Sequence, residues 1–241
     1  MKKISIIISS YNYEKYIESC VLSCLNQEGF DNFEVIVVDD GSQDASLEIL
    51  KKYAHLIRLF KNSNHGLEYE LNYAIRKADG DYIVRVDADD KLDKRFLNLT
   101  YPKIHGSKYA FVYPEYSLIN EQDEIISDVK LPDFNDVEIK KRGDFLATGT
   151  LYNKKQIAKV GLYNEAVKNC GLENYELILN LLSNNCNGLC IHQKLFYYRQ
   201  HNTNLSIKRK KDIIAYGKKL AIKFNLSGYQ TNEFHPWGLT I

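Results

Sequence analysis

The sequence lacks the features of membrane, secreted and nucleic-acid-binding proteins. No run of apolar residues approaches the ~20 that a membrane span needs, and the short apolar run after Met1-Lys2-Lys3 cannot serve as a secretory signal. Lys and Arg total 32 against 31 Asp and Glu, so the chain also lacks the excess positive charge of a nucleic-acid-binding surface. We therefore expect a cytoplasmic protein with no nucleic-acid partner.

Cysteine and proline are scarce, which narrows the class of protein further. The five cysteines, at positions 20, 24, 170, 186 and 190, are an odd number whose spacing fits neither a disulfide framework nor a C-x2-C zinc site. We expect reduced and mostly buried thiols. With only 4 Pro and 44% apolar residues in 241 positions, the composition is that of a globular protein with a substantial core.

The first ninety residues repeat one order of elements: a short apolar strand, a polar cluster and a segment with helical spacing. We expect strands over 4–8, 35–38, 57–60 and 82–86, with helices over about 17–25, 43–53 and 68–78. Ser42 stands where the N-cap of the second helix belongs. Strands that alternate with helices predict right-handed crossovers, and hence an α/β fold with a mainly parallel, Rossmann-like sheet and helices on both faces.

The second half of the chain has a weaker pattern. We expect strands over 110–113 and 195–199, a β-like piece over 148–152, and helices over 154–160 and 173–182. Residues 133–142 are expected to form a charged connection. Residues 207–224 hold seven Lys or Arg against Asp212 alone, and their apolar spacing predicts a basic amphipathic helix.

Polar clusters follow the strands of the first half and indicate a ligand site. These clusters are Tyr11-Asn12, Asp39-Asp40, Asn64-His65 and Asp87 to Asp90. Because ligands of parallel sheets bind outside the carboxyl ends of the strands, we expect the clusters to meet at one edge. Neither G-x-G-x-x-G nor G-x4-G-K-[ST] occurs, so the two commonest phosphate-binding loops are excluded.

The clusters favour a metal and a pyrimidine nucleotide. Asp87, Asp89 and Asp90 would repel one another unless a cation lies among them, and carboxylate oxygens suit Mg²⁺ or Mn²⁺. The alternative is a turn that caps a helix near position 93. Asp40 can accept the N3–H of a pyrimidine while Tyr11 stacks on its ring, although Asp, Gly and Ser also form ordinary turns.

Four motifs, taken together in their order along the chain, resemble those of glycosyltransferase family 2. They are Ser5-Ile6-Ile7-Ile8 to Tyr11-Asn12, Val37-Val38-Asp39-Asp40-Gly41-Ser42, Asn64-His65-Gly66 through Asn72, and Ala78-Asp79-Gly80-Asp81-Tyr82-Ile83 to Asp87-Ala88-Asp89-Asp90. Further similar segments extend the resemblance over about residues 4–205. It implies a GT-A fold, a nucleoside diphosphate sugar donor, transfer with inversion and a divalent metal, Mn²⁺ or Mg²⁺.

The resemblance also implies a role for each matching residue. Asp40 is expected to bind uracil or thymine, and Tyr11 to stack on it. The other expected contacts with the nucleotide sugar are Ser9, His65, Asn72, Asp87 and Ala88. The expected metal ligands are Asp89, with Asp90 as its alternate, and His201, which can reach the metal or the phosphates. A purely structural histidine is the alternative for His201.

The sequence departs from the family at the expected catalytic base. The family generally has Asp where this chain has Asn174, and an amide cannot accept a proton. Glu173 is therefore the candidate base for the acceptor hydroxyl, with Glu176 a second choice. Three alternatives stay open: Glu173 and Asn174 only cap their helix, Asn174 positions an acceptor that needs little activation, or the chain is a catalytically weak or inactive nucleotide-sugar-binding protein.

These expectations combine into one hypothesis, a metal-dependent enzyme that moves a sugar from a UDP- or dTDP-sugar to a hydroxyl of a growing surface glycan or lipid-linked acceptor. We expect a GT-A domain over 1–206, with a nucleotide-binding half, 1–105, and an acceptor-binding half, 106–206, before a basic helical extension, 207–241. Residues 207–224 form either a solvated helix face or a peripheral contact with the inner face of a membrane. The apolar tail 234–241 favours a homo-oligomer.

Overall fold

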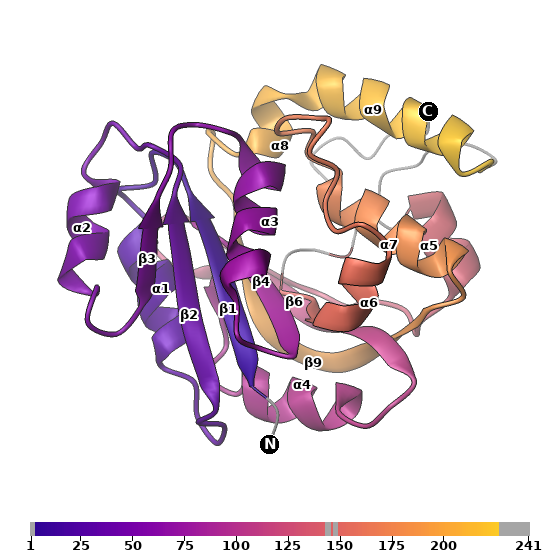
Figure 1. Cartoon of the computed structure of the whole chain (residues 1–241), viewed down its shortest axis with the longest axis horizontal. Coiled ribbons are helices and arrows are strands. Elements are labelled where there is room, and N and C mark those ends of the chain that lie inside the picture. Colours follow the sequence, from indigo (N-terminus) through magenta and orange to yellow (C-terminus); the bar gives the residue numbers. More distant parts are fainter. Residues whose placement is uncertain (1–2, 143–145, 147–148, 227–241) are drawn as a thin grey trace.

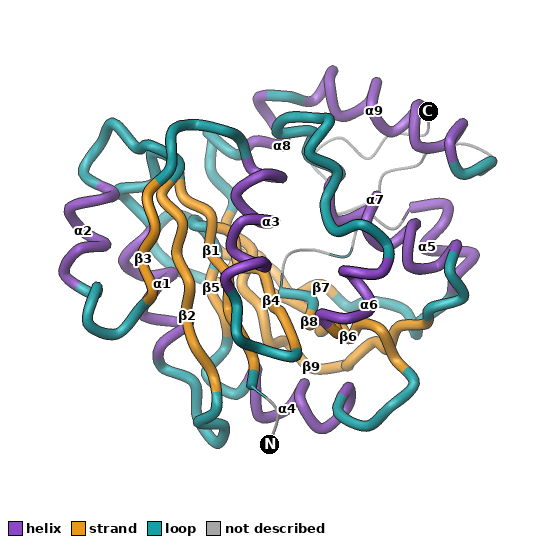
Figure 2. Tube along the Cα trace, viewed as in Figure 1, coloured by secondary structure: helices purple, strands orange, loops and turns teal. Residues whose placement is uncertain are grey.

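The chain folds into one sheet flanked by helices (Figure 1, Figure 2). The structure, a computed structural model, describes residues 3–142, 146 and 149–226. The described residues form a nine-stranded sheet in the order β3-β2-β1-β4-β8-β6-β9-β5, with β7 paired to β6. The strands are β1 (Ile4–Ser10), β2 (Phe33–Asp39), β3 (Arg58–Lys61), β4 (Tyr82–Asp87), β5 (Lys91–Leu92), β6 (Tyr109–Ile119), β7 (Ile125–Val129), β8 (Leu151–Asn153) and β9 (Asn187–Arg199).

Helices cover both faces of the N-terminal half of the sheet. Figure 1 shows α3 in front of the strands and α1 behind them. The helices are α1 (Ile17–Leu25), α2 (Ser46–Lys52), α3 (Leu67–Lys77), α4 (Phe96–Ile104), α5 (Asp136–Arg142), α6 (Lys154–Lys159), α7 (Glu173–Ser183), α8 (Leu205–Lys208) and α9 (Lys210–Lys223).

The N-terminal half confirms the expected parallel sheet. β1 pairs in parallel with β2 on one side and β4 on the other, and β3 continues the parallel order beyond β2. Near-continuous buried Ile and Val are typical of strands covered on both faces. The register aligns Ser10 with Asp39 and Ser9 with Asp87. The polar clusters after β1, β2 and β4 therefore share one edge of the sheet.

The C-terminal half of the sheet is mixed rather than parallel. β8 pairs antiparallel with both β4 and β6, while β9 pairs parallel with β6 and antiparallel with β5. The expected charged connection is wrong over residues 136–142, which form α5, and α4 has no counterpart among the expected helices. Residues 147 and 148, at the start of the expected β-like piece, lie outside the described residues.

Ser42 does not cap a helix, contrary to expectation. α2 begins only at Ser46. The Ser42 hydroxyl instead accepts the backbone N–H of Asn12, and its own N–H is donated to the Asp39 carboxylate. A turn at Gly41, with φ of 83°, directs the chain toward the loop after β1. The serine therefore joins two loops at the edge of the sheet.

The basic stretch forms the short helix α8 and the longer α9, where one helix was expected. α9 packs on α7 through a small apolar cluster separate from the main core. Its buried members are Leu172, Tyr175, Leu179, Ile213 and Leu220. Residues 227–241, which include the tail expected to contact another subunit, lie outside the described residues. Within the described ranges, no helix has the length and apolar character needed to cross a bilayer.

Candidate active site

A cavity of about 920 Å³ opens at the edge where β1, β2 and β4 end. This volume lies within the range of ~300–1,000 Å³ that is typical of small-molecule sites. The walls come from the strand ends, the start of α7 and the segment around α8. The expected site residues that line the cavity are Ser9, Tyr11, Asp40, Asp87, Ala88, Asp89, Glu173 and Asn174. The structure thus brings both halves of the chain to one cavity.

Tyr11 and Asp40 lie in the loops after β1 and β2. Tyr11 is 37% exposed and lines the cavity, so its ring is open to a stacking ligand. Asp40 is buried, and its carboxylate accepts the backbone N–H groups of His65 at 2.7 Å and Gly66 at 2.9 Å. Because an ionised carboxylate has about four lone-pair sites, Asp40 can hold this loop and still accept another hydrogen bond.

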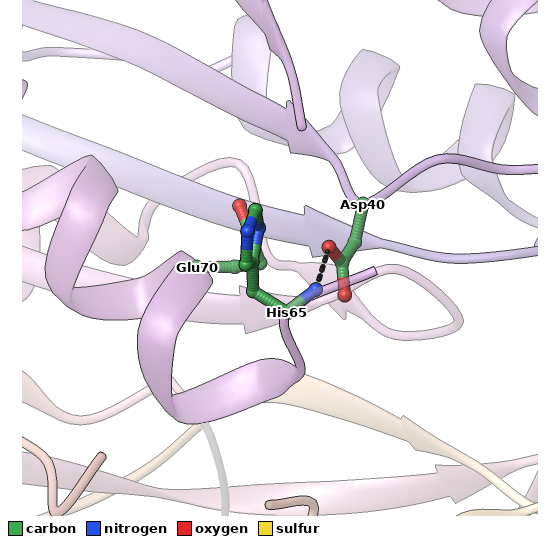
Figure 3. Close-up of side chains that lie close together, drawn as sticks. All are labelled: Asp40, His65 and Glu70. Carbon is green, nitrogen blue, oxygen red and sulfur yellow. Dashed lines mark hydrogen bonds and ion pairs between the residues drawn. The ribbon is translucent and has the colours of Figure 1, made fainter. Parts of the chain in front are cut away.

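His65 lies beside Asp40 and Glu70, as Figure 3 shows, rather than among the residues that line the cavity. Its ring packs on Tyr69 with centroids 4.5 Å apart, and its Nδ1 lies 3.5 Å from Oε1 of Glu70. Ligand atoms of Asp40, His65 and Glu70 all lie within 4.8 Å of one another. Burial, with help from the Asp40 and Asp39 carboxylates, raises the pKa of Glu70 to about 7.

Asn72 lies away from the cavity and has a structural role. Its amide oxygen accepts the backbone N–H of Tyr163 at 3.0 Å, and its amide nitrogen donates to the Tyr163 carbonyl and the Glu165 carboxylate. Asn72 therefore ties α3 to the turn before α7. Its contact with a nucleotide sugar stays a prediction.

Asp89 and His201 come together as expected from the order of the motifs. Asp89 Oδ2 lies 2.9 Å from Nε2 of His201, and Nδ1 of the same ring lies 2.7 Å from the Thr203 hydroxyl. Both Asp89 and His201 are buried. Asp90 points elsewhere, because its Oδ1 accepts the backbone N–H of Arg199 at the end of β9. The structure thus pairs Asp89 with His201 and uses Asp90 to hold β9.

The aspartates after β4 create a strongly negative site. Burial raises the pKa of Asp87 to about 6, Asp89 and Glu173 add to the increase, and the Arg85 guanidinium opposes it. The charge of Asp89, together with burial, raises the pKa of the Tyr13 phenol well above its ordinary value. Buried carboxylates that repel one another favour a cation among them.

Sequence reasoning missed Arg85, a guanidinium beside these aspartates that is only 3% exposed. Its Nε and Nη2 contact Asp87 Oδ1 at 2.8 and 2.7 Å, and its Nη1 donates to Glu173 Oε1 at 2.7 Å. The signal in the sequence is a single basic residue inside an apolar strand. Arginine is rarely buried without acidic partners, so this residue indicates a carboxylate on whatever covers β4.

Glu173 and Asn174 begin α7 and line the cavity. Oε2 of Glu173 lies 3.8 Å from the Cys170 sulfur, and the Asn174 amide oxygen accepts the Tyr163 hydroxyl at 3.0 Å. Glu173 also accepts the Arg85 guanidinium, so both side chains bond other segments of the chain rather than the free N–H groups of their own helix. This geometry favours a role in the site over the capping alternative, while their part in catalysis stays a prediction.

The mixed sheet flanked by helices is the GT-A fold, which solved structures of transferases share. S. aureus TarS in complex with UDP-GlcNAc has a TM-score of 0.73 and 20% sequence identity, covering 92% of this chain and 66% of that chain. The mannosyltransferase PcManGT from Pyrobaculum calidifontis, in complex with GDP-Man and Mn²⁺, has a TM-score of 0.68 and 17% identity, covering 91% of this chain and 62% of that chain.

The chain belongs to glycosyltransferase family 2, because the model described as Glycosyl transferase family 2 matches residues 5–159. The O-antigen biosynthesis glycosyltransferase WbnJ of Escherichia coli is 27% identical, over 96% of this chain and 88% of its own length. Glycosyltransferase GlyA of Streptococcus pneumoniae is 33% identical over 50% of this chain, and an uncharacterized glycosyltransferase of Haemophilus influenzae is 38% identical over 46%. The chain spans only 18% and 48% of the lengths of these last two relatives.

Proposed function

We propose that this chain is an inverting glycosyltransferase that moves a sugar from a UDP- or dTDP-sugar to a hydroxyl of a surface glycan or lipid-linked acceptor. The observation that carries the proposal is one cavity lined by Tyr11, Asp40, Asp87, Asp89 and Glu173. A stacking ring and a carboxylate suit a pyrimidine base, aspartates suit a metal-bound diphosphate, and a third carboxylate faces them from α7. The UDP-GlcNAc bound to the structurally similar TarS supports this choice of donor.

Asp89 and His201 fit a divalent metal such as Mn²⁺ or Mg²⁺. An imidazole nitrogen 2.9 Å from a carboxylate oxygen offers one N and one O donor, and carboxylate oxygens suit Mg²⁺ and Mn²⁺. When bound, such an ion neutralises the negative charge of the departing diphosphate. The Mn²⁺ in the PcManGT complex supports the same assignment. Asp90 is the less suited aspartate because it already holds the Arg199 N–H.

Each of these cavity residues has a distinct role in the proposed reaction. Tyr11 and Asp40 bind the base, and Asp87 orients the ribose. The acceptor oxygen bonds to the anomeric carbon while the bond from this carbon to the diphosphate oxygen breaks, so the configuration inverts. The hydroxyl proton passes to the Glu173 carboxylate, and the electron pair of the broken bond leaves with the diphosphate.

The basic stretch supports an acceptor held at an anionic surface. Lys208 of α8 lines the cavity, and Lys211, Lys218 and Lys219 are exposed along α9. Clustered lysines attract anionic lipid, each by about 1 kcal/mol. The proposal therefore includes a peripheral contact of residues 207–224 with the inner face of a membrane, close to a lipid-linked acceptor.

The test is the release of nucleoside diphosphate from UDP-, dTDP- and GDP-sugars, with Mn²⁺, with Mg²⁺ and with a chelator. We expect metal-dependent release from a UDP- or dTDP-sugar. Asp89→Asn is expected to abolish it, and Glu173→Gln to slow it by about 10²- to 10⁴-fold, the usual contribution of a general base. Asp128→Asn is the control, because this carboxylate bonds Ser117 and Lys194 outside the cavity.

Release that survives Asp89→Asn, or that needs no metal, would contradict the proposal. The second candidate function, a nucleotide-sugar-binding protein with weak or no activity, is favoured by Asn174, whose amide oxygen is bonded to Tyr163. This candidate predicts donor binding without release, and release restored by Asn174→Asp. Binding is measured by calorimetry with the same donor panel.

A further inference from the structure

Arg85 joins two sides of the cavity that come from distant parts of the chain. It lies two residues before Asp87 and on the same face of β4, because side chains alternate along a strand. The same guanidinium reaches Glu173, 88 residues further along, at the start of α7. One side chain therefore contacts both the diphosphate side and the acceptor side of the proposed site.

The contact between Arg85 and Glu173 is buried, and the guanidinium uses different nitrogens for Glu173 and for Asp87. The side chains of Arg85 and Glu173 are 3% and 8% exposed. Burying a charge without a partner is costly, so each of these groups depends on the other. The guanidinium presents Nε and Nη2 to Asp87 and Nη1 to Glu173. With Arg85 between them, two carboxylates that would repel each other keep fixed positions.

We propose that Arg85 is a positioning residue, which sets the place of Glu173 relative to the donor. This inference rests on the proposed transfer reaction. Arg85 acts through the two carboxylates: it donates to Oε1 of Glu173, and Oε2, which among the described residues accepts only the weak S–H donor of Cys170 at 3.8 Å, receives the acceptor proton. A base that loses this anchor can rotate away from the acceptor hydroxyl.

Lysine cannot perform this task. An arginine fork has donors in fixed directions, whereas an ammonium is a point charge on a flexible stem. Arg85→Lys keeps the charge and is expected to hold Asp87, which lies two residues away on the same strand, but not Glu173. Arg58 provides a matched control, because it bonds the buried Glu34 carboxylate at 2.6 Å outside the cavity.

The experiment measures kcat, KM and the donor dissociation constant for the wild-type chain, Arg85→Lys and Arg58→Lys. A small displacement of a catalytic group costs about 10²-fold, so we expect kcat of Arg85→Lys to fall about 10- to 100-fold. The donor dissociation constant, measured without acceptor, is expected to change by less than about threefold, since uniform binding is retained. Arg58→Lys is expected to match the wild type.

A double-mutant cycle separates positioning from general structural support. If Arg85 acts through Glu173, then Arg85→Met combined with Glu173→Gln is no slower than Glu173→Gln alone. The double variant leaves one carboxylate, that of Asp87, without its guanidinium, whereas Arg85→Met alone leaves two. It is therefore expected to fold where a single substitution of Arg85 does not.

Three results would overturn the role of Arg85: an unchanged kcat in Arg85→Lys, a loss confined to donor binding, or additive effects in the cycle. Failure of the proposed function looks different. A wild-type chain that releases no nucleoside diphosphate refutes the transfer reaction, whereas an active wild type with an equally active Arg85→Lys refutes only the role of Arg85.

Discussion

At the scale of single residues, the fold disfavours the ionised form of the Glu70 carboxyl. The residue is fully buried in α3, and its Oε2 accepts the Asn62 amide at 2.6 Å. Its Oε1 has no hydrogen-bond partner among the described residues. The carboxylates of Asp39 and Asp40 lie close by, and no lysine or arginine is bonded to Glu70 within the described part of the chain. The protonated form is therefore favoured in the folded state.

This imbalance predicts a pH-dependent stability. The folded-state pKa of about 7 lies above the ordinary 4.5, so the folded chain binds this proton more tightly than the unfolded chain. The contribution of this group to stability is greatest below about pH 4.5 and declines by roughly 3 kcal/mol as the pH rises through about 7. Glu70→Gln is expected to remove the decline in urea unfolding. Exposed Glu48→Gln is the control, and an unaltered pH dependence in Glu70→Gln would contradict the assignment.

Single residues also show how far sequence reasoning reaches. The resemblance to glycosyltransferase family 2 implied that Asp89 and His201 share one site, and the structure places them 2.9 Å apart, while their role as metal ligands stays a prediction. The partner of Arg85 could not be predicted in the same way. A charge inside an apolar strand shows that something must neutralise it, but the helix that covers the strand, and so the identity of Glu173, depends on tertiary packing.

At the scale of elements, Glu176 fastens α9 to α7 instead of serving the cavity. Its carboxylate accepts the Tyr216 hydroxyl at 2.6 Å and the Lys223 ammonium at 2.7 Å, and the Asn164 amide lies at 3.3 Å. The Glu176 side chain is only 3% exposed. The second choice for the base is thus engaged in holding a helix.

Tyr216→Phe is expected to loosen α9. The substitution removes a hydrogen bond to a buried carboxylate, which is worth about 1 to 3 kcal/mol. Chemical denaturation of the whole chain measures the loss, and protease cleavage between α8 and α9 reports the local opening. Lys219→Met, on the exposed face of the same helix, is the control. A Tyr216→Phe chain as stable as the control would show that Glu176 is satisfied without the phenol.

Helices and strands whose apolar spacing is visible in their own segment could be predicted from the sequence. Elements that depend on pairing or packing with distant segments could be predicted less well. The alternation of strands and helices in the first half follows from local apolar spacing. In α4, the buried residues Phe96, Leu97, Tyr101 and Ile104 have helical spacing, but Pro102 within the same segment argues against a helix. Among the described strands, β7 pairs with β6 alone, and its apolar residues Ile125 and Ile126 are exposed, so the segment lacks the alternation of a half-buried strand.

At the scale of the whole molecule, the lysines of α8 and α9 predict binding to anionic membranes. The exposed side chains of Ile207 and Ile222, 48% and 82% accessible, lie on the same two helices as the lysines. We expect the chain to sediment with anionic lipid vesicles and to be released as salt is raised, because exposed charges are screened within a Debye length.

Charge reversal tests this surface. Lys211→Glu combined with Lys218→Glu is expected to abolish vesicle binding, while release of nucleoside diphosphate from a free donor is unchanged. Neutral vesicles and the double reversal Lys51→Glu with Lys52→Glu, on the distant α2, are the controls. Equal binding to neutral and anionic vesicles would show that charge does not direct the contact.

β9 comes late in the order of synthesis, after the strands whose loops it restrains. Arg199 and His201 reach back across 109 and 112 residues to Asp90 and Asp89. The strands of the parallel half, β1 to β4, are therefore synthesised before β9. During that interval the acidic loop has neither the backbone bond that restrains it nor the imidazole beside it. The candidate site is therefore complete only after the segment through His201 has been synthesised, and a nascent chain that stalls before it carries the nucleotide-facing edge without its histidine.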